Sequence, residues 1–263
     1  MFDLSGRIAV ITGGSGAIGT SAARSLLDLG ATVILLGRSQ DKLLEAVATL
    51  AKSSAARAKC ENCDVSNEAS IRECAAKILA TYSCVHILVT CAACPAASGK
   101  FEESQLPEWQ SFIATDLTGV FLACRLFGSA MIENRYGRII NLTSFHNVAT
   151  YPYRVMYNTV KSGVEGLSRA LAVEWGHYGI TVNTVAPGPI MTPRTQWFLS
   201  QDPRNAQGML SRTPGIRIGE LQDVGAAIAY LASDEARHVN GQQLVIDGGW
   251  TKNAWWGSHT ELA

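Results

Sequence analysis

The sequence lacks the features that mark membrane, secreted and nucleic-acid-binding proteins. No uninterrupted apolar run approaches the roughly 20 residues of a membrane helix, and the N-terminal residues have neither the basic stretch nor the apolar core of a signal peptide. Charges are few and balanced, with 22 basic and 22 acidic residues and no basic stripe or acidic tail. We therefore expect a cytoplasmic protein that binds neither membranes nor nucleic acid.

Repeats, low-complexity tracts and linkers are also missing, so nothing divides the chain. With 263 residues, 47% of them hydrophobic, it suits one domain over 1–263. Strand-like runs fall near 7–12, 32–37, 57–63, 85–91, 138–143, 180–185 and 243–247, with helical patterns between them. The runs at 33–36 and 87–89 show no polar alternation, as in parallel strands covered on both faces. The pattern predicts one α/β domain, a doubly wound Rossmann-type fold with a seven-stranded parallel sheet.

Two segments have no clear period. The stretch at about 192–218 is rich in Pro, Gly and polar residues, and we expect it to be an irregular substrate loop because long loops in compact domains often form lids. Trp255 and Trp256 lie in the C-terminal tail, where we expect them to pack against a neighbouring subunit or over a cleft.

The seven cysteines are an odd number, which favours free thiols. Two pairs, Cys60/Cys63 and Cys91/Cys94, have the CxxC spacing of zinc ligands. They lie at the ends of the third and fourth predicted strands, which two other strands separate in a sheet of order 3-2-1-4-5-6. We expect no metal site.

Tyr157 and Lys161 are four residues apart, and Ser144 lies thirteen positions before the tyrosine. On a helix, residues at i and i+4 share one face. An ammonium held beside a phenol stabilises the phenolate, so the pair predicts a tyrosine that exchanges a proton with a carbonyl or alcohol. The alternative is an amphipathic helix whose ring packs inward while the lysine reaches solvent.

A glycine turn, Gly14-x-Gly16-x-x-Gly19, follows the strand at 7–12 and precedes a helical run at 20–29. That order is typical of dinucleotide sites, where backbone amides at a helix N-terminus meet a pyrophosphate. The carboxylate that would accept from the ribose hydroxyl of NAD is missing at the end of the second strand. Gly37 stands there, followed by Arg38, a cation for the 2′-phosphate of NADP(H). Alternatively, Arg38 is simply solvated.

These residues together resemble the classical short-chain dehydrogenases/reductases over nearly the whole chain. The matching segments are Thr12-Gly13-x-x-x-Ala17-x-Gly19, Asp64-Val65, Ser144 with Tyr157 and Lys161, Pro187-Gly188 with Thr192, and Asp247-Gly248-Gly249. In that family they form the cofactor turn, the adenine contact, the catalytic residues, the segment that closes on the nicotinamide and the end of the last strand. Ala17 replaces a glycine of the family turn.

The resemblance implies two sets of site residues beside the catalytic ones. The cofactor set is Gly13, Ser15, Gly16, Ile18, Gly19, Arg38, Asp64, Val65, Tyr157, Lys161, Pro187, Gly188, Ile190 and Thr192. The substrate set follows the catalytic serine or flanks Thr192, and comprises His146, Tyr151, Tyr153, Met191, Trp197 and Phe198. Those aromatic residues could equally form the core of a lid.

Two positions depart from the family pattern. Residues 90–93 stand where the family has Asn-Asn-Ala-Gly, so the central strand must be hydrogen-bonded differently. Asp116 stands in place of the asparagine that completes the family's catalytic tetrad. Its carboxylate either lies beside Lys161 and offsets the pull of the ammonium on Tyr157, or points to solvent or a helix end.

The resemblance is strongest to gluconate 5-dehydrogenases and related sugar-acid or polyol enzymes, and implies an NADP(H)-dependent oxidoreductase with a small-molecule substrate. Reduction of 3-oxoacyl or 2,4-dienoyl thioesters is a second hypothesis, and a non-catalytic dinucleotide-binding protein is a third. Gly163, Gly166 and Ala170 form a stripe of small residues on the Tyr157 helix. The family association suggests a homotetramer built through that helix, although the stripe could also pack on the chain's own sheet.

Overall fold

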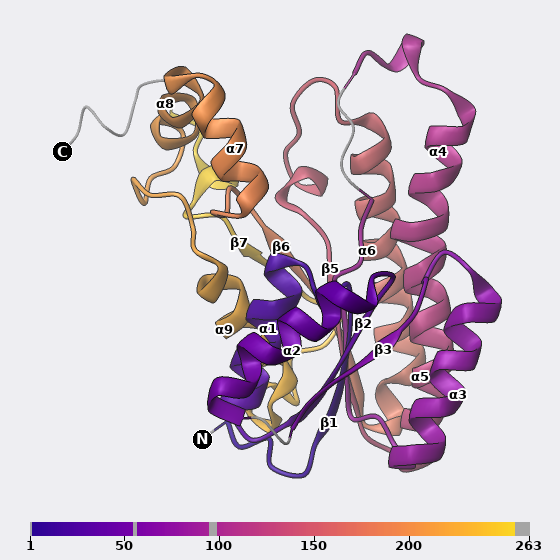
Figure 1. The fold of residues 1–263 in the computed structure, drawn as a ribbon. Coiled ribbons are helices and arrows are strands. Elements are labelled where there is room, and N and C mark those ends of the chain that lie inside the picture. The colour runs from indigo at the N-terminus through magenta and orange to yellow at the C-terminus, as the bar shows by residue number, and fades with distance from the viewer. Residues whose placement is uncertain (1, 55–56, 95–98, 256–263) are drawn as a thin grey trace.

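The computed structural model describes residues 2–54, 57–94 and 99–255, and its centre is one seven-stranded parallel sheet (Figure 1). The strands are β1 (Ile8–Thr12), β2 (Thr32–Gly37), β3 (Ala58–Asn62), β4 (Ile87–Thr90), β5 (Gly137–Leu142), β6 (Ile180–Pro187) and β7 (Gln243–Ile246), in the order β3-β2-β1-β4-β5-β6-β7. The predicted fold class and all seven strands are confirmed. The order changes direction between β1 and β4, the point at which doubly wound sheets bind ligands.

Helices cover both faces of the sheet (Figure 1). One face carries α1 (Ala17–Asp28), α2 (Gln40–Ser54) and α9 (Leu221–Ala232), and the other carries α3 (Glu68–Tyr82), α5 (Gly119–Asn134) and α6 (Val155–Trp175). Neighbouring residues of one strand serve different faces: Ile11 packs in the first core cluster and Val10 in the second. The absence of polar alternation in the strands therefore has a direct structural cause, because both sides of the pleat are buried.

One helical run is long and apolar enough, by length and composition alone, to cross a membrane. It spans 106–134 and consists of α4 (Leu106–Phe112), a π-helical turn η2 (Ile113–Thr118) and α5. Half of its apolar window is buried inside the protein, and the core helix of a soluble protein passes the same test. The expectation that the protein does not bind membranes remains a prediction.

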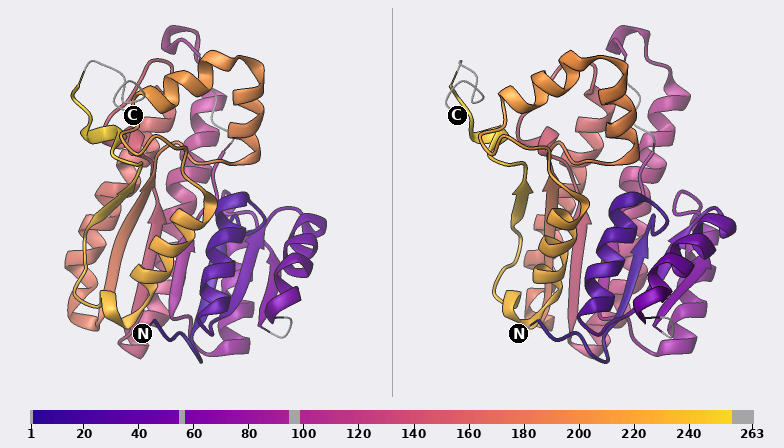
Figure 2. Two further views of the ribbon diagram at one scale, coloured as in Figure 1. Left: turned by 90° about the vertical axis from the view of Figure 1, so that its left-hand side faces the viewer. Right: turned by 60° about the vertical axis from the view of Figure 1, so that its left-hand side comes forward.

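The segment at 192–218 is not an irregular loop, as we expected, but contains α7 (Pro193–Gln201) and α8 (Pro203–Ser211). Each helix starts with proline in its first turn, after a residue that caps it: Thr192 Oγ1 accepts from the Thr195 amide, and Asp202 Oδ1 accepts from the Arg204 amide. Neither helix contains a buried residue. Figure 2 shows both lying beyond the carboxyl ends of the strands.

Short 3₁₀ turns complete the described chain: η1 (Phe101–Glu103), η3 (Phe145–Asn147), η4 (Gly176–Tyr178), η5 (Asp234–Ala236) and η6 (Trp250–Lys252). Trp255 is about one-third exposed, at 37%. Trp256, the other tryptophan of the expected tail contact, lies outside the described residues.

Candidate active site

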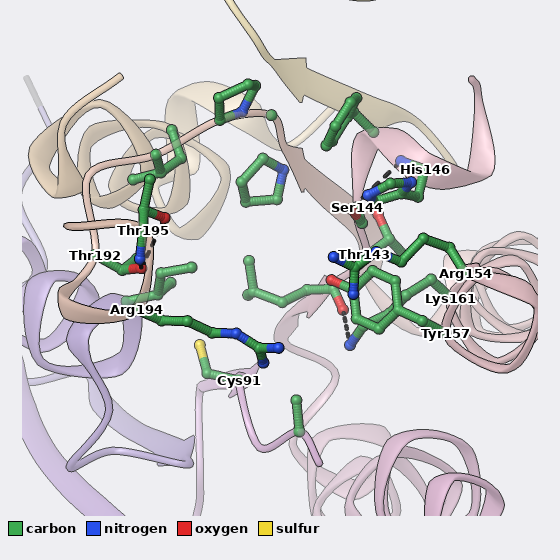
Figure 3. A pocket seen from close by; sticks show the side chains of 18 of the residues that line it. Cys91, Thr143, Ser144, His146, Arg154, Tyr157, Lys161, Thr192, Arg194 and Thr195 are labelled. Atoms are coloured by element: carbon green, nitrogen blue, oxygen red, sulfur yellow. Dashed lines mark hydrogen bonds between the residues drawn. The ribbon is translucent and has the colours of Figure 1, made fainter. Parts of the chain in front are cut away.

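A cavity of about 300 Å³, here called the catalytic pocket, opens at the carboxyl edge of the sheet (Figure 3). It is lined by residues that follow β4, β5 and β6 together with the starts of α6 and α7. Among the predicted site residues it brings together Ile18, Ser144, His146, Tyr151, Tyr157, Lys161, Pro187, Gly188, Ile190 and Thr192. Side chains assigned from separate segments of the sequence to catalysis, cofactor and substrate therefore share one cavity.

The three predicted catalytic side chains come from two neighbouring elements. Ser144 follows β5 and is buried, and its Oγ accepts from the His146 amide at 3.3 Å. Tyr157 and Lys161 lie one turn apart on α6, with Lys161 Nζ 5.7 Å from the centre of the tyrosine ring. They share the helix face that their spacing predicts. A hydroxyl, a phenol and an ammonium on one cavity wall can bind a carbonyl oxygen and exchange a proton with it.

Asp116 lies beside the lysine. Its side chain is fully buried in the π-helical turn, and Oδ1 lies 3.2 Å from Lys161 Nζ, an ion-pair contact outside hydrogen-bond geometry. The other carboxylate oxygen accepts from the Cys94 amide at 2.6 Å, and Lys161 Nζ also donates to the Leu142 carbonyl at 3.2 Å. Of the two alternatives for Asp116, the structure shows the one in which the carboxylate faces the lysine.

The altered stretch after β4 is held by a different set of hydrogen bonds, as the sequence required. Thr90 Oγ1 donates to Asn141 Oδ1 at 2.8 Å, and Asn141 Nδ2 donates to Ser168 Oγ at 2.9 Å. These bonds connect β4, β5 and α6 through buried side chains. At the strand end, the Cys91 amide donates to the Thr12 carbonyl at 3.1 Å. The position next to the glycine turn is therefore well anchored.

The glycine turn between β1 and α1 fits a dinucleotide. Gly13 has φ of +65°, and a Cβ on it would lie 2.7 Å from the Ala92 amide nitrogen. A Cβ on Gly19 would overlap the carbonyl oxygen of Gly13. Gly16, the N-cap of α1, offers no side-chain cap, and the first turn of the helix contains no acidic residue. The backbone amides at this helix start thus remain available to an anion such as a pyrophosphate.

The remaining cofactor candidates lie near the carboxyl ends of β1, β2 and β3. Arg38 is exposed directly after β2, and a Cβ on Gly37 would be 3.6 Å from Ser15 Oγ. Asp64 Oδ1 accepts from the Ser66 amide and hydroxyl, at 3.0 and 2.6 Å. Val65 is buried and packs close to Gly119. This edge offers one exposed cation and no carboxylate at the end of β2, as the sequence indicated.

The predicted substrate residues divide into three groups. His146 and Tyr151 line the catalytic pocket, and Trp197 and Phe198 line a larger adjoining cavity of about 780 Å³, here called the outer cavity. Tyr153 and Met191 join neither of these cavities. Tyr153 has φ of +69° and lines a separate hollow beside α4, and Met191 lines another beside α1 and α9. Their sequence neighbours Arg154, Ile190 and Thr192 do line the catalytic pocket, so the two predictions were wrong by a single position along the chain.

His146 is the least expected group in the pocket. The residue is 6% exposed, and its Nδ1 is buried without a hydrogen-bond partner. Its ring meets the Tyr157 ring edge to face, with centres 5.6 Å apart. Burial, and then the charge of Arg154, lower the pKa of His146 to about 4. The imidazole is therefore neutral near pH 7 and offers an unsatisfied nitrogen beside Tyr157, the predicted proton donor.

Sequence reasoning missed several lining residues. The catalytic pocket also contains Cys91, Arg154, Arg194, Thr195 and Met209. Burial raises the pKa of Cys91 to about 12, so it is a neutral thiol. Arg154 lies three residues before Tyr157, and Arg194 lies two residues after Thr192. Their closeness to assigned site positions was a sequence signal that could have identified them as pocket residues.

The CxxC pairs stay apart, because β2 and β1 separate β3 from β4. All seven cysteines are free thiols. Over the ranges that the structure describes, no three His, Cys, Asp or Glu side chains are grouped as metal ligands.

Comparison with known proteins identifies the family. A family model described as enoyl-(acyl carrier protein) reductase matches residues 13–251. D-threitol dehydrogenase of Mycolicibacterium smegmatis is 32% identical over 252 residues, 95% of each chain. The 3-oxoacyl-(acyl-carrier-protein) reductase of Escherichia coli is 35% identical over 93% of this chain and 97% of its own. Among solved structures, a gluconate 5-dehydrogenase from Burkholderia cenocepacia in complex with NADP and tartrate superposes with a TM-score of 0.91 and 29% identity, covering 96% of this chain and 98% of that one. The chain belongs to the short-chain dehydrogenase/reductase family of oxidoreductases.

Proposed function

We propose that the protein is an NADP(H)-dependent oxidoreductase that transfers hydride between the nicotinamide and a carbonyl or secondary alcohol of a small polar molecule of the sugar-acid or polyol type. The observation that carries this proposal is the convergence of Ser144, Tyr157 and Lys161 in the catalytic pocket with Pro187 and Thr192 of the predicted nicotinamide segment. A volume of about 300 Å³ lies at the lower end for ligand pockets and favours a small substrate.

Each catalytic residue has a defined task in this reaction. The Ser144 hydroxyl donates a hydrogen bond to the substrate oxygen, and the Tyr157 phenol gives its proton to that oxygen in reduction or takes one in oxidation. Lys161 supplies positive charge beside the phenol and would hold the nicotinamide ribose of a bound cofactor. Asp116 holds the buried ammonium in place. The cofactor, once bound on the glycine turn, supplies the hydride chemistry, and the protein orients the reacting groups.

The preference for NADP(H) rests on residues 37 and 38. Arg38 provides an exposed guanidinium directly after β2, where a 2′-phosphate would lie, and Gly37 provides no competing carboxylate. The Burkholderia relative was solved with NADP, which supports the same assignment.

Reduction of an acyl thioester is the second candidate. Two observations favour it: the similarity to the 3-oxoacyl reductase of E. coli and the outer cavity, which is open enough for a longer chain. The third hypothesis, a non-catalytic protein, has the altered stretch at 90–93 as its only support. Thr90 Oγ1 donates to Asn141 Oδ1 at the start of that stretch, so a hydrogen bond is present there, which counts against this hypothesis.

The deciding experiment is a substrate panel. Sugar acids, polyols, 3-oxoacyl thioesters and simple ketones are each incubated with purified protein and NADPH or NADH, or with the oxidised forms, and the absorbance of the reduced cofactor is followed. Turnover of a sugar acid or polyol supports the proposal, and turnover of thioesters alone selects the second candidate. No turnover with any class, combined with normal cofactor binding, selects the non-catalytic reading.

We also propose that the protein is a cytoplasmic homotetramer assembled through α6. A Cβ on Gly163 would contact Leu117 of the same chain at 3.1 Å, so that part of the stripe packs internally. Gly166 has nothing within 4 Å of its Cβ position, which leaves room for a second backbone. Light scattering at micromolar concentration tests the assembly, and a monomeric mass contradicts it.

A further inference from the structure

The outer cavity is larger than the proposed reaction needs. Its volume is about 780 Å³, against about 300 Å³ for the catalytic pocket. The two cavities adjoin along a shared wall that includes Phe145, Tyr151, Pro189 and Met209. Cavities of several hundred Å³ are the usual size of sites for small organic ligands. A polyol or sugar acid held at the catalytic residues would therefore leave the outer cavity free for a further part of the same molecule.

Aromatic rings dominate the apolar lining of this cavity. Phe145 is buried, and its ring centre lies 5.0 Å from that of Trp250, edge to face, and 6.3 Å from that of Tyr151. Helix α7 adds the rings of Trp197 and Phe198. No Leu, Ile or Val is among the described residues that line the cavity. The lining is therefore suited to a flat ring better than to an alkyl chain, because aromatic pairs gain from ring geometry beyond the area that they bury.

Three of these rings remain unusually exposed. The exposed fraction is 64% for Trp197, 42% for Phe198 and 41% for Tyr151. Because α7 contains no buried residue, its two rings contribute nothing to the core of the protein. Large apolar side chains that gather at one exposed place are typical of binding sites. A ligand in the outer cavity would cover ring surface that the chain itself leaves in water.

Two arginine side chains of the cavity also favour an aromatic ligand. The guanidinium carbon of Arg154 lies 5.7 Å from the centre of the Tyr151 ring, and that of Arg212 lies 5.0 Å from the centre of the Trp250 ring. Guanidinium groups are attracted to the faces of aromatic rings, and both residues line the outer cavity. An aromatic ring placed here adds to stacking that is already present, whereas an alkyl chain gains nothing from the charge.

We infer that the substrate carries a flat aromatic ring, which the outer cavity binds while the carbon to be oxidised or reduced lies at Ser144 and Tyr157. The inference rests on the proposed function and extends it from free polyols and sugar acids to alcohols or ketones that bear an aryl group. The shared wall assigns the ring to the substrate, because a molecule that extends out of the catalytic pocket passes along Phe145 and Tyr151, which line both cavities.

The test measures binding and does not depend on turnover. Calorimetric titrations use the Tyr157→Phe protein, first alone and then saturated with whichever nicotinamide cofactor it binds. The probes are 1-phenylethane-1,2-diol, 1-cyclohexylethane-1,2-diol and octane-1,2-diol. All three carry the same pair of hydroxyl groups, so their comparison isolates the group that enters the outer cavity. We expect the phenyl compound to bind at least about 5-fold more tightly than the cyclohexyl compound or the alkyl compound.

Ring variants in the same background locate the contact. Trp197→Leu and Phe198→Leu keep an apolar side chain but remove the ring, and each should weaken binding of the phenyl compound about 5-fold or more. Binding of the cyclohexyl compound should change less than about 2-fold. The matched control is Phe101→Leu, which removes a ring that is 60% exposed in the separate hollow beside α4. It should change the affinity for the phenyl compound less than about 2-fold.

Three results would overturn the inference. The first is cyclohexyl or alkyl binding as tight as phenyl binding, which would place an alkyl group in the outer cavity. The second is an equal loss of affinity in Phe101→Leu. The third is a smaller particle mass by light scattering for Trp197→Leu with unchanged affinity for the phenyl compound, because a second copy of the chain would then cover the rings. Failure to bind any nicotinamide cofactor would instead refute the proposed function, and the titrations of the cofactor-free protein would still decide the inference.

Discussion

The cofactor side and the substrate side of the pocket are built differently. On the cofactor side, α1 buries Gly19, Ala22, Ala23, Leu26 and Leu27, and the glycine turn fits against neighbouring backbone with no room for a Cβ. On the substrate side, α7 and α8 have no buried residue and are fixed by caps and a few polar contacts. The cofactor side is therefore specified by residues of the core, whereas side chains on the substrate side can change without disturbing that core.

The largest effect should come from a substitution in α6, the helix that carries Tyr157 and borders both the cofactor side and the substrate side of the pocket. Tyr157→Phe removes the transferable proton and little else, so we expect turnover to fall by about 10²–10⁴-fold while cofactor affinity changes less than about 2-fold. Steady-state rates and a cofactor titration measure the two quantities. Activity within a factor of two of wild type would remove the basis for the catalytic assignment.

A matched pair of glycine substitutions tests the comparison directly. Gly19→Ala places a methyl group against the Gly13 carbonyl, whereas Gly208→Ala in α8 meets no atom within 4 Å. We expect Gly19→Ala to cost about 1–3 kcal/mol of unfolding free energy and to weaken cofactor binding. Gly208→Ala should be neutral or stabilise by up to about 1 kcal/mol through helix propensity. Urea unfolding measures both, and equal costs would show that the two sides are equally constrained.

We expect that a substitution on the cofactor side can change the choice of cofactor without altering the substrate side of the pocket. At Gly37 a new Cβ would meet its nearest neighbour, Leu43 Cδ2, at 3.4 Å, which is an ordinary contact. Gly37→Asp adds a carboxylate that accepts from the ribose hydroxyl of NAD and repels a 2′-phosphate. We expect the ratio of kcat/KM for NADPH over NADH to fall about 10-fold or more. A wild-type protein that uses both cofactors equally well would contradict the assignment before any substitution is made.

Asp116→Asn asks whether the buried ion pair influences the catalytic tyrosine. The carboxylate lies 3.2 Å from Lys161 Nζ and offsets part of the positive charge that Tyr157 experiences. If the carboxylate acts on the reaction through its charge, a neutral amide in its place should move the pH–rate profile for alcohol oxidation to lower pH. Leu142→Met, which keeps the main-chain carbonyl contact to Lys161, controls for nonspecific disturbance of the pocket. An unchanged profile for Asp116→Asn would mean that the carboxylate acts only through position.

The smallest expected effect is the change in the free energy of unfolding with pH that is due to His146 on the substrate side. The pKa of His146 is about 4 in the folded protein against an ordinary 6.5. As pH falls, His146 is protonated in the unfolded chain before it is protonated in the folded protein. The contribution of this residue to the free energy of unfolding, which is present above pH 6.5, is therefore lost between pH 6.5 and pH 4. Between about pH 7.5 and about pH 5.5, wild type should lose about 1 kcal/mol more than His146→Leu. Urea unfolding at the two pH values provides the measurement, and parallel losses in both proteins would contradict the burial of a neutral imidazole.

The cofactor side of the pocket could be predicted from the sequence because its features depend on residues that lie close together in the chain. Apolar strand runs, a glycine turn and the Tyr157–Lys161 spacing all depend on backbone geometry within a few residues. The substrate side was harder to predict, because its structure is less evident from neighbouring residues in the chain. Pro193 and Pro203 looked like loop residues, but each follows a capping residue and starts a helix. Arg154 and Arg194 stand close to assigned site positions in the sequence, but only the fold shows that both side chains line one cavity.

Helix α6 carries both Arg154 at its start and Tyr157 in its first turn. A helix turn advances about 5.4 Å, and a packed helix does not stretch. The helix therefore fixes the distance between its first residue and Tyr157, so a substrate that contacts the start of α6 would be held at a set distance from the group that exchanges its proton. A series of alcohols in which the hydroxyl moves one carbon at a time along the molecule should accordingly show one sharp optimum, with rates falling on both sides of it.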